Sequence, residues 1–159
     1  MRKKRVYKKY HEADIKYDRI EVGRFINCVM HDGKKSTAEK IVYDALDRVK
    51  EITKEDPLKV FEKAMENASP LLEVTSRRVG GANYQIPQEV RPGRKFMLAT
   101  RWLIDAARKK KGKPMSEKLA EEFIAASKNE GAAIKKKQDT HRMAEANRAF
   151  AHFARGAAR

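Results

Sequence analysis

The apolar residues of this chain mostly recur every three to four positions, the spacing that places them on one face of an α-helix. The first such segment follows Asp18, a residue suited to an N-cap, and Asp32-Gly33 is expected to end it with a left-handed stop. The second follows Ser36-Thr-Ala-Glu39, which has the spacing of a capping box. Its apolar stripe is continuous and consists of Ile41, Val42, Ala45, Leu46, Val49 and Ile52.

Four further helices are predicted downstream. Asp56-Pro57 has the cap and first-turn residues of a short helix that Ser69-Pro70 ends. A fourth helix follows Arg91-Pro92-Gly93, and a fifth, capped by Ser116, turns Leu119, Phe123 and Ile124 inward. The last helix follows the break at Asn129-Glu-Gly131. Its expected buried side consists of Met143, Asn147, Phe150, Ala151 and Ala154.

One segment, residues 72–90, favours β-strands instead, because β-branched and alternating apolar residues flank Gly80-Gly81. An isolated two-stranded ribbon is marginal in water, so its base is expected to rest on helices through Leu72, Val74, Ile86 and Val90, while its tip extends beyond them. The predicted fold is mainly α: a single-domain bundle of about six helices with one protruding β-hairpin between the third and fourth helices.

The pattern also predicts how the chain is divided. Residues 1–17 show neither period and are expected to form a basic RNA-binding arm that is disordered when free. Residues 18–156 form the helical domain with the hairpin, and residues 157–159 are a frayed C-terminus. A length of 159 residues with 41% hydrophobic content suffices for one modest core.

The net charge of +15 and the sequence pI near 10.0 point to a polyanionic partner, because such a chain repels itself in isolation. The charge is uneven. Residues 1–10 hold six bases and no acid, and residues 91–113 hold nine bases and one acid, whereas residues 39–73 hold nine acids and six bases. The partner is therefore expected at the arm, the hairpin and the fourth helix, with the acidic helices as scaffold.

Three groups of basic residues are candidate phosphate contacts. The arm contributes Arg2, Lys3, Lys4, Arg5, Lys8 and Lys9. Lys34 and Lys35 lie beside the free N-terminal amides of the second helix, where an anion is favoured. The fourth helix contributes Arg91, Arg94, Lys95, Arg101 and Arg108. Arg94, Arg101 and Arg108 are seven residues apart and share its polar face. The alternative for each group is an ordinary solvated surface.

The hairpin tip adds a different chemistry. Arg77 and Arg78 offer charge, and Tyr84 offers an aromatic ring, a combination that suits an anionic polymer that carries bases. Two other classes of protein are alternatives. A helix-turn-helix DNA regulator needs a recognition helix after a tight turn, whereas here a ribbon precedes the most basic helix. A membrane-surface protein needs a large apolar helix face, which this chain lacks.

No pattern predicts catalysis, a cofactor or a metal. His11, His31, His141 and His152 are scattered without zinc-site spacing, and no phosphate-binding glycine loop of a nucleotide-binding enzyme occurs. Cys28 is the only cysteine, which suits a reducing compartment. No apolar run approaches the length of a membrane span, so a membrane partner is not expected. A small-molecule substrate is not expected either.

Several motifs together carry a resemblance that covers nearly the whole chain. They are Phe25-Ile-Asn, Asp32-Gly-Lys-Lys-Ser-Thr-Ala-Glu39, Ser76-Arg-Arg-Val-Gly-Gly-Ala-Asn-Tyr-Gln85, Glu89-Val-Arg-Pro92, Arg101-Trp102 and His141-Arg-Met-Ala-Glu-Ala-Asn-Arg-Ala-Phe-Ala-His152. In this order they resemble the family of ribosomal protein number seven of the bacterial small subunit.

The resemblance implies a non-catalytic cytoplasmic protein that binds the 3′ major domain of small-subunit ribosomal RNA and starts assembly of the subunit head. It implies ribosomal RNA contacts for the arm, the Lys34-Lys35 loop and the Arg91 to Arg101 region. It also implies that the ribbon and the C-terminal helix lie near exit-site transfer RNA and messenger RNA, and that the C-terminal region meets ribosomal protein eleven. The residues placed by that path are Arg77, Arg78, Asn83, Tyr84, Arg142 and Arg148.

Overall fold

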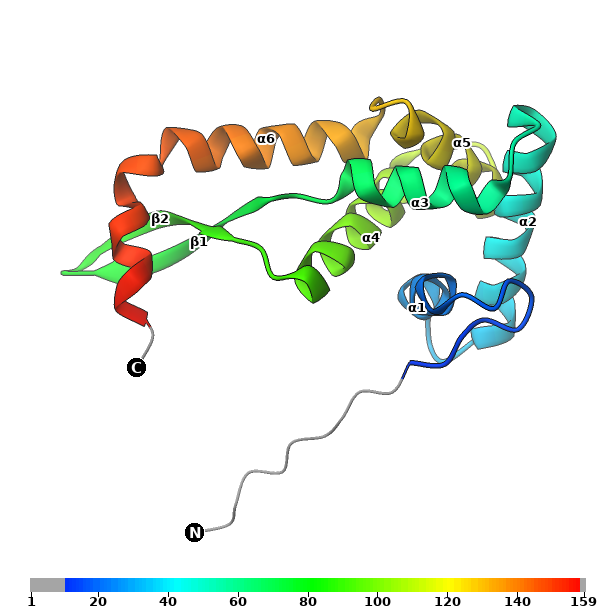
Figure 1. Cartoon of the computed structure of the whole chain (residues 1–159), viewed down its shortest axis with the longest axis horizontal. Coiled ribbons are helices and arrows are strands. Elements are labelled where there is room, and N and C mark those ends of the chain that lie inside the picture. Colours follow the sequence, from blue (N-terminus) through cyan, green and yellow to red (C-terminus); the bar gives the residue numbers. More distant parts are fainter. Residues whose placement is uncertain (1–10, 158–159) are drawn as a thin grey trace, which may run out of the picture. The chain divides into compact units, whose positions relative to one another are not determined.

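The computed structural model describes residues 11–157. In chain order these residues form α1 (Ile20–Val29), α2 (Lys35–Thr53), α3 (Pro57–Ala68), β1 (Leu72–Val79), β2 (Ala82–Glu89), α4 (Pro92–Lys109), α5 (Met115–Ser127), α6 (Ala132–Ala146) and the 3-10 helix η1 (Arg148–Ala157) (Figure 1). The predicted mainly helical fold, with one hairpin between the third and fourth helices, is confirmed. Internal contacts divide the chain into two compact units, residues 1–40 and 41–159. The predicted division into arm, helical domain and frayed end stays a prediction.

In the first unit, α1 buries four apolar residues at helical spacing: Val22, Phe25, Ile26 and Val29. The predicted cap at Asp18 is wrong. Asp18 has a positive φ of 49°, and the helix begins at Ile20 after Arg19, whose side chain makes no capping hydrogen bond. The preceding turn is held instead by the buried Asp14, whose carboxylate accepts backbone N–H groups at residues 16 and 17, each at 3.2 Å. Spacing alone did not indicate this turn.

The link from α1 to α2 also departs from expectation. The cap residue after α1 is Met30, with a φ of −56° rather than a left-handed conformation. Asp32 and Gly33, at φ 52° and 73°, form the left-handed turn two residues later and lead the chain into α2. Because α2 begins at Lys35, Ser36 lies inside its first turn and the predicted capping box is wrong.

The second unit has its core where α3, α4 and α5 pack on one another. Asp56 caps α3 as predicted, since its Oδ1 accepts the backbone N–H of Leu58 at 3.0 Å. Phe61 of α3 meets Phe123 of α5 edge to face, with ring centroids 5.5 Å apart. From α4, Leu103 and Ala107 are fully buried. The part of α2 in this unit buries Val42, Ala45, Leu46 and Val49, whereas Ile52 is 56% exposed.

The last two helices differ from the prediction in their caps, bounds and buried positions. The predicted cap at Ser116 is wrong, because α5 begins at Met115 after Pro114. Ile124 is only half-buried, although Leu119 and Phe123 point inward as predicted. The single last helix is in fact α6 followed by η1. The buried positions of α6 are Ala133, Ile134, Thr140 and Ala144, whereas Met143, expected inward, is 42% exposed.

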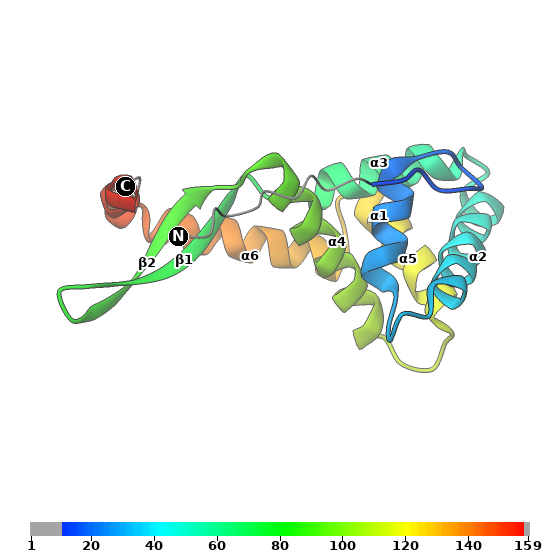
Figure 2. The ribbon, with the colours of Figure 1, turned by 90° about the horizontal axis from the view of Figure 1, so that it is seen from below.

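The ribbon is a two-stranded antiparallel sheet that extends beyond α3, α4 and α5, while α6 runs alongside it and η1 packs against β2 (Figure 2). Its turn consists of Gly80 and Gly81, at φ 57° and 93°, the positive angles that a two-residue hairpin turn requires. Ile86 and Val90 anchor its base, at 0% and 5% exposure. Leu72 and Val74 are only half-buried, so β2 contributes most of the anchoring.

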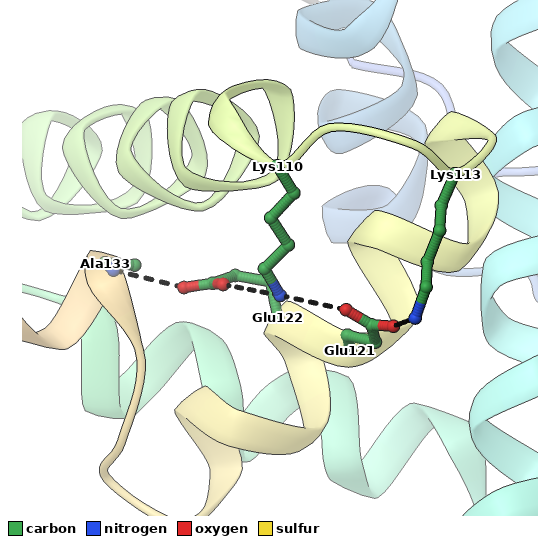
Figure 3. Close-up of polar contacts among 5 residues, drawn as sticks. All are labelled: Lys110, Lys113, Glu121, Glu122 and Ala133. Carbon is green, nitrogen blue, oxygen red and sulfur yellow. Dashed lines mark hydrogen bonds and ion pairs between the residues drawn. The ribbon is translucent and has the colours of Figure 1, made fainter.

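A polar cluster joins α4 to α5 (Figure 3). Lys110, the residue after α4, lies 3.2 Å from the carboxylate of Glu122 and 3.4 Å from that of Glu121. Glu121 also pairs with Lys113, which raises the pKa of Lys113 and lowers that of Glu121 through their hydrogen bond and opposite charges. Glu122 is 1% exposed, so Lys110 neutralises a charge that burial would otherwise disfavour.

Candidate nucleic-acid interface

The exposed face of α4 is a basic surface of the second unit. Arg91, Arg101 and Arg108 are exposed, on the side of the helix away from the buried Leu103. One acid interrupts the row, because Asp105 is exposed and lies one turn after Arg101. The predicted separation of a packing face from a basic face is therefore present in this helix.

Part of the charge in residues 91–113 is already paired. Arg94 is 3.2 Å from Glu73 of β1, Lys110 binds Glu121 and Glu122, and Lys113 binds Glu121. Lys95 is half-buried. The segment thus presents fewer open cations than its composition indicates, since neighbouring acids from β1 and α5 take up some of them.

In the first unit, Lys34 and Lys35 lie where the sequence placed them, exposed at the N-terminus of α2. Lys35 Nζ is 3.8 Å from Glu39 Oε1, a loose pair that leaves the side chain 60% exposed. Exposed helix amides and two cations favour an anion here. The predicted arm contacts Arg2, Lys3, Lys4, Arg5, Lys8 and Lys9 lie outside the described residues.

The ribbon tip differs from the expected open surface. Arg77 and Tyr84 are register partners, and both are half-buried against η1. Arg77 Nη1 donates to the carbonyl oxygen of Phe153 at 3.0 Å. The ring of Tyr84 lies 5.1 Å from Phe150 and 5.6 Å from Phe153. The expectation that Arg77 and Tyr84 project freely from the tip is therefore wrong. The local sequence of the ribbon does not indicate that η1 packs beside β2.

The other two candidate residues of the ribbon tip are open. Arg78 and Asn83 are opposite each other in the ribbon, and both are exposed. Arg142 on α6 and Arg148 on η1 are exposed as well. These four polar side chains, rather than Arg77 and Tyr84, are the groups of this region that a ligand reaches without displacing η1.

A groove of about 630 Å³ lies between the base of the ribbon, α6 and η1. Leu72 and Pro87 line it from the ribbon, and Ala144 and Arg148 line it from the opposite side. His141, also in its wall, accepts the backbone N–H of Leu71 through Nε2 at 3.1 Å. Burial lowers the pKa of His141, and the nearby Lys137 lowers it further.

A second groove, of about 280 Å³, lies between α4 and α6 and was missed by the sequence reasoning. Trp102 and Lys109 line it from α4, and Lys135 and Asp139 line it from α6. Each helix contributes residues with the three-, four- and seven-residue spacing of one helix face, but the sequence does not indicate that α4 and α6 lie side by side.

The described residues give no sign of other chemistry. No group of three or more His, Cys, Asp or Glu side chains among residues 11–157 is arranged to hold a metal ion. No described helix is long and apolar enough to cross a membrane. The candidate site is a set of charged and aromatic surfaces.

Comparison with known proteins assigns most of the chain to one protein family. Residues 1–148 match the family described as ribosomal protein S7p/S5e. The small ribosomal subunit protein uS7 of Thermotoga maritima is 59% identical over 153 residues, covering 96% of this chain and 99% of the relative. The uS7 proteins of Elusimicrobium minutum (61% over 142 residues, 89% of each chain) and Magnetococcus marinus (55% over 152 residues, 96% and 97%) are similar as well. The chain belongs to the S7p/S5e family of ribosomal proteins and is a structural, non-enzymatic protein of the small ribosomal subunit.

Proposed function

We propose that this protein binds the 3′ major domain of small-subunit ribosomal RNA and thereby starts assembly of the subunit head. The observation that supports it best is the basic face of α4, where Arg91, Arg101 and Arg108 are exposed while the opposite face is buried. Lys34 and Lys35 add a second phosphate site at the start of α2. The arm bases at residues 2–9 complete the proposed RNA surface.

The test is direct binding of the purified protein to an RNA transcript of the 3′ major domain, with footprinting of the complex. Neutralising roughly six to ten phosphates gives a slope of about −4 to −9 for log affinity against log salt. A transcript of the 5′ domain and a duplex DNA of equal length serve as controls. Equal affinity for all three ligands, or a slope shallower than about −2, contradicts the proposal.

We further propose that the ribbon tip and the C-terminal elements lie beside exit-site transfer RNA and messenger RNA. Arg78, Asn83, Arg142 and Arg148 support this, since all four are exposed and polar. Arg77 and Tyr84 belong to the same region but act through η1, which they hold against the ribbon.

The tip proposal is tested with the double variant Arg78→Ala/Asn83→Ala, which leaves the contacts of Arg77 and Tyr84 with η1 intact. Subunits assembled with it are expected in normal yield, with faster dissociation of exit-site transfer RNA and more reading-frame errors. Failed head assembly with normal exit-site behaviour in the surviving subunits would assign the tip to assembly instead.

The remaining partner is ribosomal protein eleven, for which we propose contact with the C-terminal region. The 630 Å³ groove supports this, because its apolar wall of Leu72, Pro87 and Ala144 is flanked by Glu145 and Arg148. Leu71, just before β1, and Met143 on α6 are exposed, which suits a protein surface better than an RNA backbone. Crosslinking from position 145 in assembled subunits tests it, and an RNA-only crosslink contradicts it.

A further inference from the structure

The groove between α4 and α6 is built from two matching sets of side chains. α4 leads away from the ribbon and α6 returns toward it (Figures 1 and 2). α4 contributes Trp102, Asp105, Ala106 and Lys109. α6 contributes Ala132, Lys135, Lys136 and Asp139. Each set has the i, i+3, i+4, i+7 spacing of a single helix face, and the alanine in each leaves room between the helices.

The groove has an aromatic wall. Trp102 is the only tryptophan of the chain, and it is half-buried, so part of its ring lines the groove rather than the core. Its indole makes no hydrogen bond or ring contact with another described residue. A flat aromatic surface that is open on one side is a stacking platform for a nucleobase.

The groove also has open acceptors. Asp105 and Asp139 line it, and neither forms an ion pair or a side-chain hydrogen bond with another residue in the 11–157 range. A carboxylate has only acceptor oxygens and therefore takes N–H donors. Two donors side by side, such as N1–H and N2–H₂ on the Watson–Crick edge of guanine, match its two oxygens better than the single donors of other bases.

The rim is cationic. Lys109, Lys135 and Lys136 are exposed, and none forms an ion pair with another described side chain. Three ammonium groups around two carboxylates leave a net positive charge, which suits a phosphate and repels a metal cation. The volume of about 280 Å³ is near the lower limit of roughly 300–1,000 Å³ for small-ligand pockets, so the groove fits one base rather than a stacked pair.

From the lining residues, their exposure and their charges, we propose that the α4–α6 groove holds one unpaired guanine of the RNA that the protein binds. The base stacks on Trp102, its Watson–Crick edge donates to Asp139 or Asp105, and its flanking phosphates lie on the lysines. This inference rests on the proposed RNA-binding function and deepens it, because it converts one part of a phosphate-binding surface into a site that reads a base.

Because Trp102 is the only tryptophan, its fluorescence reports on this groove alone. The full-length protein is titrated with five-nucleotide RNAs that have uridine at every position except the centre, which is guanine, adenine, cytosine, uracil or an abasic residue. All five ligands carry the same phosphates. Strong quenching and the tightest binding are expected for the guanine ligand, and no quenching is expected for the abasic one. Equal affinity for all five ligands would overturn the proposal.

Variants separate the stack from the edge contact and from folding. Trp102→Leu is expected to lose about 5- to 150-fold in affinity for the guanine ligand, the usual range for one aromatic stack, whereas Trp102→Phe loses less. Asp139→Asn together with Asp105→Asn is expected to remove the preference for guanine while the lysine contacts remain. Affinities of these variants are read from labelled RNA. A preference that survives the double variant overturns the edge contact, and a Trp102→Leu variant with unchanged affinity overturns the stack.

The same preparations are tested with the 3′ major-domain transcript. If the transcript binds with the expected salt slope but the five-nucleotide ligands show no base preference, this inference fails and the proposed function stands. If the transcript does not bind in preference to the 5′ domain, the proposed function fails first.

Discussion

The carboxylate of Glu122 on α5 accepts the backbone N–H of Ala133 at the start of α6, with 3.1 Å between Oε1 and N (Figure 3). The cap residue of α6 is Gly131, which has no side chain to bond the first amides. Glu122 therefore supplies from a neighbouring helix the acceptor that an N-cap residue normally supplies locally. The same carboxylate pairs with Lys110, so one buried group joins the end of α4 to α5 and α6.

Removing this acceptor is expected to destabilise the fold. Glu122→Ala leaves the Ala133 amide without a partner and should lower the free energy of unfolding by about 1–3 kcal/mol. Glu122→Gln keeps an acceptor oxygen and should cost less. The matched control is Glu121→Ala, whose side chain is 37% exposed and pairs with Lys110 and Lys113 at the surface. Urea unfolding measures all three, and equal losses for Glu121→Ala and Glu122→Ala contradict this role.

A side chain at Gly131, in the loop before α6, is expected to destabilise the fold. Gly131 has a φ of 98°, and a Cβ added there would lie 2.9 Å from Glu122 Oε1 and 3.2 Å from Ala125 Cβ. Because its ψ of 172° places Gly131 in a region essentially restricted to glycine, Gly131→Ala should cost more than the roughly 1–3 kcal/mol of backbone strain alone, since it also displaces the Glu122 carboxylate.

Two other glycines in the same unit separate these costs. Gly112 has a φ of 81° with nothing within 4 Å of an added Cβ, so Gly112→Ala should show the strain alone. Gly93 lies in α4 with ordinary backbone and open space, and Gly93→Ala should stabilise by about 0.4–1 kcal/mol. Thermal unfolding ranks the three variants, and a Gly131→Ala loss no larger than that of Gly112→Ala contradicts the crowding.

Elements that depend on local spacing could be predicted from the sequence, whereas contacts between separate elements could not. Asp56 caps α3 and Gly80-Gly81 turns the ribbon because both effects act within two or three residues. Glu122 capping α6 could not be predicted, since its partner lies eleven residues away across a loop. The capping-box spacing at Ser36 was misleading, because the helix already starts at Lys35 and Ser36 lies inside its first turn.

In the candidate site, too, features of one element could be predicted and contacts between elements could not. The exposed arginine face of α4 follows from helical periodicity, which is a property of one element. Coverage of Arg77 and Tyr84 by η1 follows from packing between residues about 70 positions apart, which no periodicity encodes. The groove beside Trp102 needs two helices at once, and the sequence predicts each helix without saying that they adjoin.

Acid is expected to weaken the base of the ribbon through His141. Burial and Lys137 hold its pKa below the ordinary 6.5, so the folded state favours the neutral imidazole, whose Nε2 accepts the Leu71 amide. The stability that this gives is present above pH about 6.5 and is lost as pH falls through the lower folded-state value. Unfolding free energies of the wild type and His141→Gln, compared at about pH 7.5 and about pH 5.5, measure it. An identical pH dependence in both proteins contradicts the prediction.

Contacts between the ribbon and η1 should be measurable as a coupling energy. Tyr84 and Phe150 have ring centroids 5.1 Å apart, and such a pair contributes about 0.5–1.5 kcal/mol beyond area burial. A double-mutant cycle with Tyr84→Ala and Phe150→Ala isolates this energy in chemical unfolding. Arg78→Ala is the control, because its side chain is exposed on the same strand. Strictly additive losses at Tyr84 and Phe150 mean that η1 does not hold the ribbon.

The basic face of α4 gives the last prediction, which separates binding from folding. Arg101 is exposed, and neighbouring Leu103 points into the core, so Arg101→Ala removes a cation without opening a cavity. Loss of one charge-assisted phosphate contact should weaken binding to the 3′ major-domain transcript by about 1.5–3 kcal/mol. The salt slope should become shallower by about 0.7–0.9. The matched control is Arg48→Ala on α2, where the guanidinium is 3.5 Å from Glu117 and 49% exposed. Affinity and slope should not change for Arg48→Ala, and both variants should melt within a few degrees of the wild type. If Arg101→Ala lowers the melting temperature while RNA affinity and slope stay unchanged, Arg101 supports the fold and the RNA contact lies elsewhere on the chain.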